Sequence, residues 1–114
     1  FNGIEGVISP TKNFRTGNAL HLYIIRIIPD LWKISRDELI NKINQKGIGT
    51  SVHYIPIHMH SYYKKKYGFK PDSFPQSKAL SETVISLPLY PALKDKEVNY
   101  IAKTISDLWE EYKV

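Results

Sequence analysis

The stretch Leu20-His21-Leu22-Tyr23-Ile24-Ile25-Arg26-Ile27-Ile28 is the longest mostly apolar run of the chain. It is rich in β-branched and aromatic residues, and it would place apolar side chains on both faces of an extended backbone. Such a run predicts a central strand, covered on both sides or covered by a helix on one side and by a neighbouring domain on the other. Pro29 and Asp30 end it, so the rest of the fold has to be built around this strand.

The segment that follows predicts a helix. Ser35-Arg36-Asp37-Glu38 has the spacing of a capping box, in which the serine oxygen accepts from the third backbone N–H and the glutamate reaches back. Leu39, Ile40 and Ile43 then form one apolar stripe. Gly47 suits the left-handed conformation in which helices often end. One helix of about a dozen residues is therefore expected here.

Weaker signals predict the shorter elements. The turn-rich start of the chain contains one apolar pair, Val7-Ile8, which suits an edge strand. Thr50-Ser51-Val52-His53-Tyr54-Ile55 has the composition of a strand, which Pro56 closes. The remaining short elements are two helices and a strand near an edge: Ser61 to Tyr67 before Gly68, a Ser73-capped helix to about Glu82, and Val84 to Leu87 before Pro88 and Pro91.

The C-terminal segment has the strongest helical periodicity, and Asp95 is its predicted N-cap. Apolar residues recur at intervals of three and four along one face: Val98, Ile101, Ala102, Ile105, Leu108, Trp109 and Tyr112. The order of elements is therefore β-β-α-β-α-α-β-α. This order predicts an α+β fold with one long terminal helix and a small, antiparallel-rich sheet covered by helices.

The chain has 114 residues, the length of one domain, and 42% of them are hydrophobic, which argues against extended disorder. The absence of cysteine excludes disulfides, thiolate metal ligands and a cysteine nucleophile, and it suits the reducing cytoplasm. Sixteen basic against 11 acidic residues leave a net charge of +5, which permits an anionic ligand.

No apolar run approaches the ~18 residues of a membrane span, so no membrane partner is expected. The start at Phe1 indicates a piece of a longer polypeptide.

Three of the four histidines lie within His53-Tyr54-Ile55-Pro56-Ile57-His58-Met59-His60. A metal site would need converging ligands, and no acid lies nearby. Hydrolase chemistry would need a nucleophile, but Ser51 and Ser61 sit in no recognisable elbow. Two interpretations are stronger: rings that bond to backbone carbonyls, and a binding loop whose histidine and tyrosine donate to an oxygen-rich ligand.

The run Tyr62-Tyr63-Lys64-Lys65-Lys66-Tyr67 interleaves aromatic rings with three cations. This composition is typical of a surface that binds RNA or another polyanion. A solvated helix face explains it equally simply and is the favoured interpretation. No RNA-binding or zinc-finger motif supports a nucleic-acid partner.

Arg26 is the one charged residue in the apolar run, and a guanidinium there needs a partner. A structural salt bridge to Asp30 or Glu38 is the favoured interpretation. The functional alternative is a bidentate clamp on a substrate carboxylate or phosphate.

Taken in order, these motifs resemble the C-terminal region of the DegT-type sugar aminotransferases, pyridoxal-phosphate enzymes that aminate keto groups of nucleotide-linked sugars. The resemblance runs from about Leu20 to Leu108, nearly the whole chain. It rests on a series of short segments: Leu20–Arg26, Arg36–Leu39, Gly47–Thr50, Val52–His58, Phe74-Pro75 and Ser86–Pro91.

The resemblance implies that residues 1–114 are the small C-terminal domain of a fold type I aminotransferase. In that family the Schiff-base lysine, the aspartate facing the pyridine nitrogen and the phosphate cup belong to a large upstream domain. No lysine of this chain matches the context of the catalytic lysine, so the chain alone should be inactive. The parent enzyme would be a cytoplasmic homodimer that takes its amino group from glutamate.

The same resemblance assigns roles to four residues. His53 and Tyr54 would face the sugar or its phosphates, with His58 close by. Arg26 would reach the carboxylate of the amino donor. Some members of the family act as dehydratases or sensors, and the identity of the sugar and of the aminated carbon is not implied.

Overall fold

The computed structural model describes residues 1–11, 19 and 21–114. Three strands, four α-helices and three 3-10 turns alternate along this part of the chain. In order they are β1 (Val7–Ile8), β2 (Tyr23–Ile27), η1 (Pro29–Leu31), α1 (Arg36–Gln45), η2 (Ile57–Met59), α2 (Ser61–Tyr67), η3 (Pro71–Ser73), α3 (Pro75–Thr83), β3 (Val84–Leu87) and α4 (Asp95–Tyr112).

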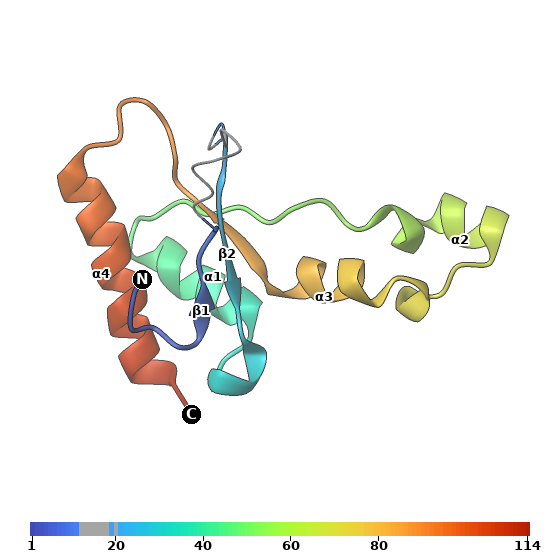
Figure 1. The fold of residues 1–114 in the computed structure, drawn as a ribbon, viewed down its shortest axis with the longest axis horizontal. Coiled ribbons are helices and arrows are strands. Elements are labelled where there is room, and N and C mark those ends of the chain that lie inside the picture. The colour runs from blue at the N-terminus through green and yellow to red at the C-terminus, as the bar shows by residue number, and fades with distance from the viewer. Residues whose placement is uncertain (12–18, 20) are drawn as a thin grey trace.

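The strands form one antiparallel sheet in the order β1-β2-β3, so β2 is central and β3 lies at an edge, as predicted. Val7 pairs with Ile27 on one side of β2, and Tyr23 pairs with Leu87 on the other. Helices cover one face of this sheet (Figure 1). The predicted α+β class, with a small antiparallel sheet and covering helices, is confirmed.

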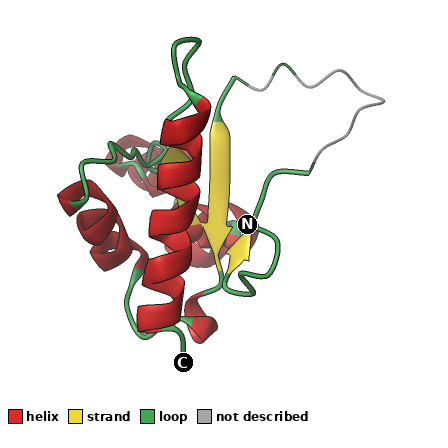
Figure 2. Cartoon of the chain, turned by 90° about the vertical axis from the view of Figure 1, so that its left-hand side faces the viewer, coloured by secondary structure: helices red, strands yellow, loops and turns green. Residues whose placement is uncertain are grey.

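The core lies between the sheet and helices α1 and α4. Ile25 and Ile85 from the strands, Leu39 and Ile43 from α1, and Ile105 from α4 are completely buried there. Helix α4 runs alongside the strands in both views of the fold (Figure 1 and Figure 2). The tryptophan rings Trp32 and Trp109 belong to this core and form an edge-to-face pair, with centroids 5.0 Å apart.

The opposite face of β2 is not covered to the same extent. Ile25 and Ile27 are buried, but Ile24 is half-buried and Arg26 is exposed. The first of the two predicted alternatives, a strand covered on both faces, is therefore wrong for this chain. Helices α1 and α4 cover one side of the sheet, and α3 borders the other side without burying it.

Both long helices form largely as predicted. The Ser35 hydroxyl accepts from the Glu38 N–H and the Glu38 carboxylate accepts from the Ser35 N–H, which completes the capping box of α1, and Gly47 follows with φ +76°. Helix α4 differs in detail. Its N-cap is Lys94, whose N–H donates to Glu97, and Asp95 is its first residue.

Val98, predicted to face the core from α4, is instead 46% exposed. The buried face of α4 begins one turn later, at Ile101.

The predicted strand at Thr50–Ile55 is wrong, because only Ser51 pairs with β3, through an isolated antiparallel bridge to Ser86. In that register Gly49 would oppose Pro88, which has no N–H to donate. His53 would oppose Val84, whose N–H already caps α3 through the Leu80 carbonyl. The Val84 carbonyl accepts from the Arg36 guanidinium. The ladder therefore cannot extend in either direction.

Residues 52–82 instead form an arm that projects from the body of the molecule, with α2 at its far end (Figure 1). The radius of gyration is 15.9 Å, whereas a compact domain of this length would have about 13 Å. Helix α2 has the predicted bounds and ends at Gly68, with φ +67°.

The N-terminus of α3 also departs from the prediction. Pro75 occupies the first helical position as expected, but the N-cap is Phe74 and not Ser73. The Ser73 hydroxyl accepts from the Lys70 N–H within η3, so it is not available to cap the next helix.

Candidate functional site

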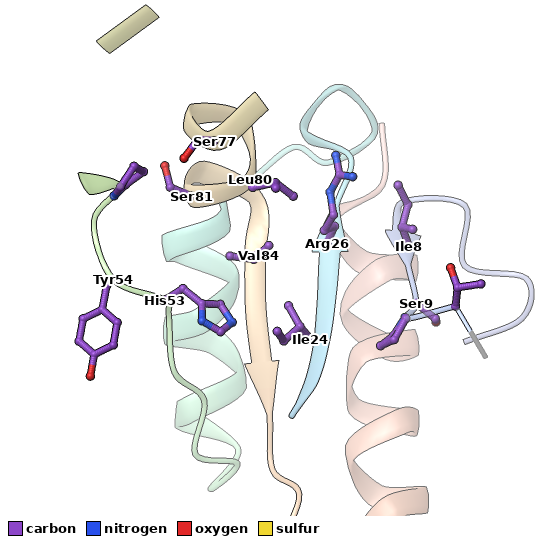
Figure 3. A pocket seen from close by; sticks show the side chains of 13 residues that line it. Ile8, Ser9, Ile24, Arg26, His53, Tyr54, Ser77, Leu80, Ser81 and Val84 are labelled. Atoms are coloured by element: carbon purple, nitrogen blue, oxygen red, sulfur yellow. The ribbon is translucent and has the colours of Figure 1, made fainter. Parts of the chain in front are cut away.

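A pocket of about 560 Å³ lies on the face of the sheet that α1 and α4 leave uncovered (Figure 3). Its walls come from the end of β1, from β2, from the start of the arm and from α3. Thirteen residues line it: Ile8, Ser9, Pro10, Thr11, Ile24, Arg26, His53, Tyr54, Pro56, Ser77, Leu80, Ser81 and Val84. Three of the four predicted site residues, Arg26, His53 and Tyr54, are thus brought to one pocket.

The alternation of the strands explains which side chains reach the pocket. Because successive side chains of a strand point to opposite faces, Ile24 and Arg26 face the pocket where Ile25 and Ile27 face the core. The register pairs Arg26 with Val84, which also lines the pocket. The floor is therefore apolar with one guanidinium at its edge.

The His53 ring is oriented by a hydrogen bond to β3. Its Nε2 lies 3.2 Å from the Ser86 hydroxyl, and Ser86 is buried. Figure 3 shows the ring directed toward the strands. The second ring nitrogen has no partner among the described residues, so it can bond to a ligand.

Arg26 does not form the predicted salt bridge. Within residues 1–11, 19 and 21–114 there are four ion pairs, and none includes Arg26 or Asp30. Glu38, the other predicted partner, accepts from the backbone and hydroxyl of Ser35 instead. The guanidinium is exposed at the pocket, where it can bind an anion in a bidentate manner.

Tyr54 lies at the rim of the pocket and is 95% exposed. Its ring points away from the strands in Figure 3. Within the described residues its hydroxyl makes no hydrogen bond, so a ligand or another part of the protein has to approach before this ring can contribute to a site.

The structure separates His58 from the other predicted site residues. His58 is buried, and its Nε2 lies 3.0 Å from the Pro71 carbonyl, while the exposed His60 bonds in the same way to the Ile55 carbonyl. The interpretation of rings bonded to backbone carbonyls is therefore confirmed for these two histidines. His58 lines a second hollow on the arm and not the pocket with Arg26.

Sequence reasoning did not find Ser77, Leu80, Ser81 and Ser86 as contributors to this site. Ser77 and Ser81 lie four residues apart and Leu80 lies beside them, so all three share one face of α3. Ser86 could have been noticed as the one polar residue of the apolar strand Val84–Leu87. Its hydrogen bond to the His53 ring becomes apparent only in the structure.

The cations of α2 lie elsewhere. Lys64, Lys65 and Lys66 are all exposed, which agrees with a solvated helix face. The Lys66 ammonium lies over the Tyr62 and Tyr67 rings, at 5.5 and 5.2 Å from their centroids.

No three histidine or acidic side chains in the described part of the chain lie close enough together to hold a metal ion. No helix there is both long and apolar enough to cross a membrane.

Comparison with known proteins identifies the family to which this chain belongs. The model of the DegT/DnrJ/EryC1/StrS aminotransferase family matches residues 1–106, so the chain belongs to that family. An uncharacterized protein of Methanocaldococcus jannaschii is 40% identical over 111 residues, which are 94% of this chain and 29% of the relative. The spore coat polysaccharide biosynthesis protein SpsC of Bacillus subtilis is 35% identical over 95% of this chain and 28% of its own length.

Solved structures agree. Spr1654 of Streptococcus pneumoniae, assigned as a sugar aminotransferase, matches in its PMP form with a TM-score of 0.80 and 31% identity over 93% of this chain and 26% of its own. DesV of S. venezuelae, in complex with a ketimine intermediate, matches with a TM-score of 0.80 and 26% identity over 96% of this chain and 28% of its own. This chain thus spans less than a third of the length of the relatives it matches.

Pyridoxal phosphate is the cofactor of the parent family, and Spr1654 is known in both its PLP and PMP forms. The cofactor requires a lysine that forms a Schiff base in an enclosed site. No lysine is among the residues lining the pocket, which is lined by hydroxyl, imidazole, guanidinium and apolar groups. The described residues of the pocket therefore do not provide a complete site for this cofactor.

Proposed function

We propose that this chain is the C-terminal domain of an enzyme that transfers an amino group, taken from glutamate, to a keto group of a nucleotide-linked sugar. The observation that supports this most directly is the convergence of Arg26, His53 and Tyr54 on one pocket that no acidic residue lines. A guanidinium, an imidazole and hydroxyls suit a ligand that carries both negative charge and many oxygens. The net charge of +5 favours the approach of such a ligand.

In this proposal His53 and Tyr54 bind the sugar or its phosphates, and Arg26 binds the carboxylate of the amino donor. The catalytic lysine and the cofactor belong to the additional polypeptide that the relatives have, so this chain alone is inactive. The parent enzyme is a cytoplasmic homodimer joined mainly through that additional polypeptide. Its product serves polysaccharide or envelope sugar synthesis, a role that the name of SpsC supports.

The cofactor role is tested on the full-length parent protein. Its absorbance is recorded after reconstitution with pyridoxal phosphate, before and after glutamate is added. A cofactor band that shifts on addition of glutamate supports the aminotransferase. The absence of any band after reconstitution would contradict it.

The role of Arg26 gives a prediction of its own. In the full-length enzyme, Arg26→Gln should raise the KM for glutamate by about tenfold or more, because a charge-assisted bond to the carboxylate is lost. The KM for the nucleotide-sugar should change much less. Arg26→Lys is the matched control: it keeps the charge but loses the bidentate geometry, and it should restore only part of the affinity. A change confined to the sugar KM would assign Arg26 to the phosphates instead.

A second candidate, a basic module that binds RNA or another polyanion, is favoured only by the exposed lysines and tyrosines of α2. Replacement of Lys64, Lys65 and Lys66 by alanine distinguishes it. If these residues form a solvated face, transamination by the parent enzyme should stay within about twofold of wild type, because exposed charges far from a site contribute little. If the variant no longer binds RNA but its transamination is unchanged, α2 is a polyanion-binding surface separate from the transamination site.

A further inference from the structure

The arm, residues 52–82, has almost no buried side chains. From residue 52 to residue 82, one side chain is buried, and it is that of His58, which is 5% exposed. All other side chains of the arm are exposed or half-buried. The arm therefore has no aliphatic core of its own, and its shape depends on contacts between aromatic rings and on hydrogen bonds, among which those of this histidine are the most buried.

Those contacts join the two legs of the arm. His58 lies on the outgoing leg, in η2, and its Nε2 lies 3.0 Å from the Pro71 carbonyl in η3 on the returning leg. Because a carbonyl only accepts, Nε2 carries the proton in this bond. The imidazole also packs against Phe74 at 4.9 Å between centroids, and Phe74 packs edge-on against Phe69 at 5.2 Å.

The two legs that His58 joins carry two walls of the pocket. The outgoing leg carries His53 and Tyr54. The returning leg continues from Phe74, the N-cap of α3, into the helix whose Ser77, Leu80 and Ser81 form the facing wall. The hollow between the legs is lined by residues of both, including His53, His58, Phe74 and Ser77.

We propose that His58 is a positioning residue, which fixes the separation between the His53 segment and α3 and thereby the width of the pocket for the nucleotide-sugar. The inference rests on the proposed function, in which that pocket binds the sugar. This role takes the place of the direct substrate contact that the family resemblance implies for His58. The ring is buried, its Nε2 is bonded to the Pro71 carbonyl, and it does not line the pocket.

Three variants of the full-length enzyme test this role. His58→Phe keeps a ring against Phe74 but removes the donor, and it leaves the Pro71 carbonyl without its partner. His58→Gln keeps a side-chain N–H that can reach an acceptor. His60→Phe is the matched control, since His60 is exposed and its ring bonds only to Ile55 on the same leg.

The first readout is hydrogen exchange, which does not depend on activity. His58→Phe should lose protection at the amides of Met59 and His60, which bond to the Pro56 and Ile57 carbonyls, and at the amide of Lys78, which forms the first helical bond of α3. Helices α1 and α4 should keep their protection, and His60→Phe should match wild type. Unchanged protection of both segments in His58→Phe would overturn the proposal.

The second readout is kinetic. His58→Phe should raise the KM for the nucleotide-sugar by up to about tenfold, the effect of losing one hydrogen bond between the two legs, with little change in the KM for glutamate or in cofactor binding. His58→Gln should recover part of this loss. Equal losses toward both substrates would overturn positioning in favour of general destabilisation. If amide protection is lost but the KM for the nucleotide-sugar is unchanged, His58 does join the two legs. The assignment of the pocket to the sugar would then be overturned.

Discussion

The full-length enzyme carrying His53→Ala should use its nucleotide-sugar about 10- to 100-fold less efficiently, the range expected when one or two hydrogen bonds to a ligand are lost. The imidazole is oriented by the buried Ser86 hydroxyl at 3.2 Å and is directed into the pocket, so its free nitrogen is preorganised for a sugar or phosphate oxygen. The measurement is kcat/KM for the nucleotide-sugar, with the cofactor absorbance and the reaction with glutamate recorded in parallel. Both of the latter should remain intact.

Ser86→Ala provides the matched control for this prediction. It leaves His53 in place but removes the hydroxyl that orients it, so the loss in kcat/KM should be smaller than for His53→Ala and in the same direction. Combining both substitutions should cost little more than His53→Ala alone, because the two residues act through one contact. Loss of the cofactor band in His53→Ala would contradict the assignment of this residue to the sugar.

The elements that sequence predicted well are those with local causes. The capping box at Ser35 and Glu38 and the glycines at positions 47 and 68 determine helix ends through their own hydrogen bonds and φ angles. Strand β2 was predicted because its composition is strand-like along its whole length. In each case the signal and the structure lie within a few residues of each other.

The failures arise where another residue already occupies the hydrogen-bonding group that the predicted element would need. Thr50–Ile55 has the composition of a strand, but the groups it would pair with on Val84 are taken by Leu80 and Arg36. Ser73 has the spacing of a helix cap, but its hydroxyl is engaged by Lys70. The first competition is not visible in a local pattern, because Val84 and Arg36 are distant in sequence from each other and from Thr50–Ile55. The second is local, but the spacing alone does not show which of two neighbouring N–H groups the Ser73 hydroxyl accepts from.

The candidate site likewise combines residues that stand out in the sequence with an arrangement that only the folded chain creates. Arg26 and His53 were identified because an arginine in an apolar strand and a cluster of histidines are conspicuous in sequence. Their presence in one pocket depends on the register of the sheet and on the path of the chain after Ser51. The family resemblance placed His58 close to the sugar, and only the structure shows that this ring is buried against Pro71 and Phe74.

The largest effect on stability should come from Gly6→Ala. An added Cβ at this position would lie 2.1 Å from Cζ3 of Trp109 and 2.5 Å from Nε1 of Trp32, distances that no real Cβ contact adopts. Neither ring can move freely, because both are buried, they pack on each other at 5.0 Å, and Trp32 Nε1 donates to the Gly6 carbonyl at 2.9 Å. Overpacking of a filled core costs about 3 kcal/mol where the neighbours cannot adjust.

Gly49→Ala is the control that separates this steric effect from any general effect of replacing a glycine. Its Cβ would meet nothing within 4 Å, so the unfolding free energy should be unchanged within about 0.5 kcal/mol. Urea unfolding of the full-length protein, followed by tryptophan fluorescence, should give a lower midpoint for Gly6→Ala alone. Equal midpoints for the two variants would contradict the tight packing of the tryptophan pair. Because Gly6 immediately precedes β1, whose Ile8 lines the pocket, displacement of this strand should also weaken binding of the sugar.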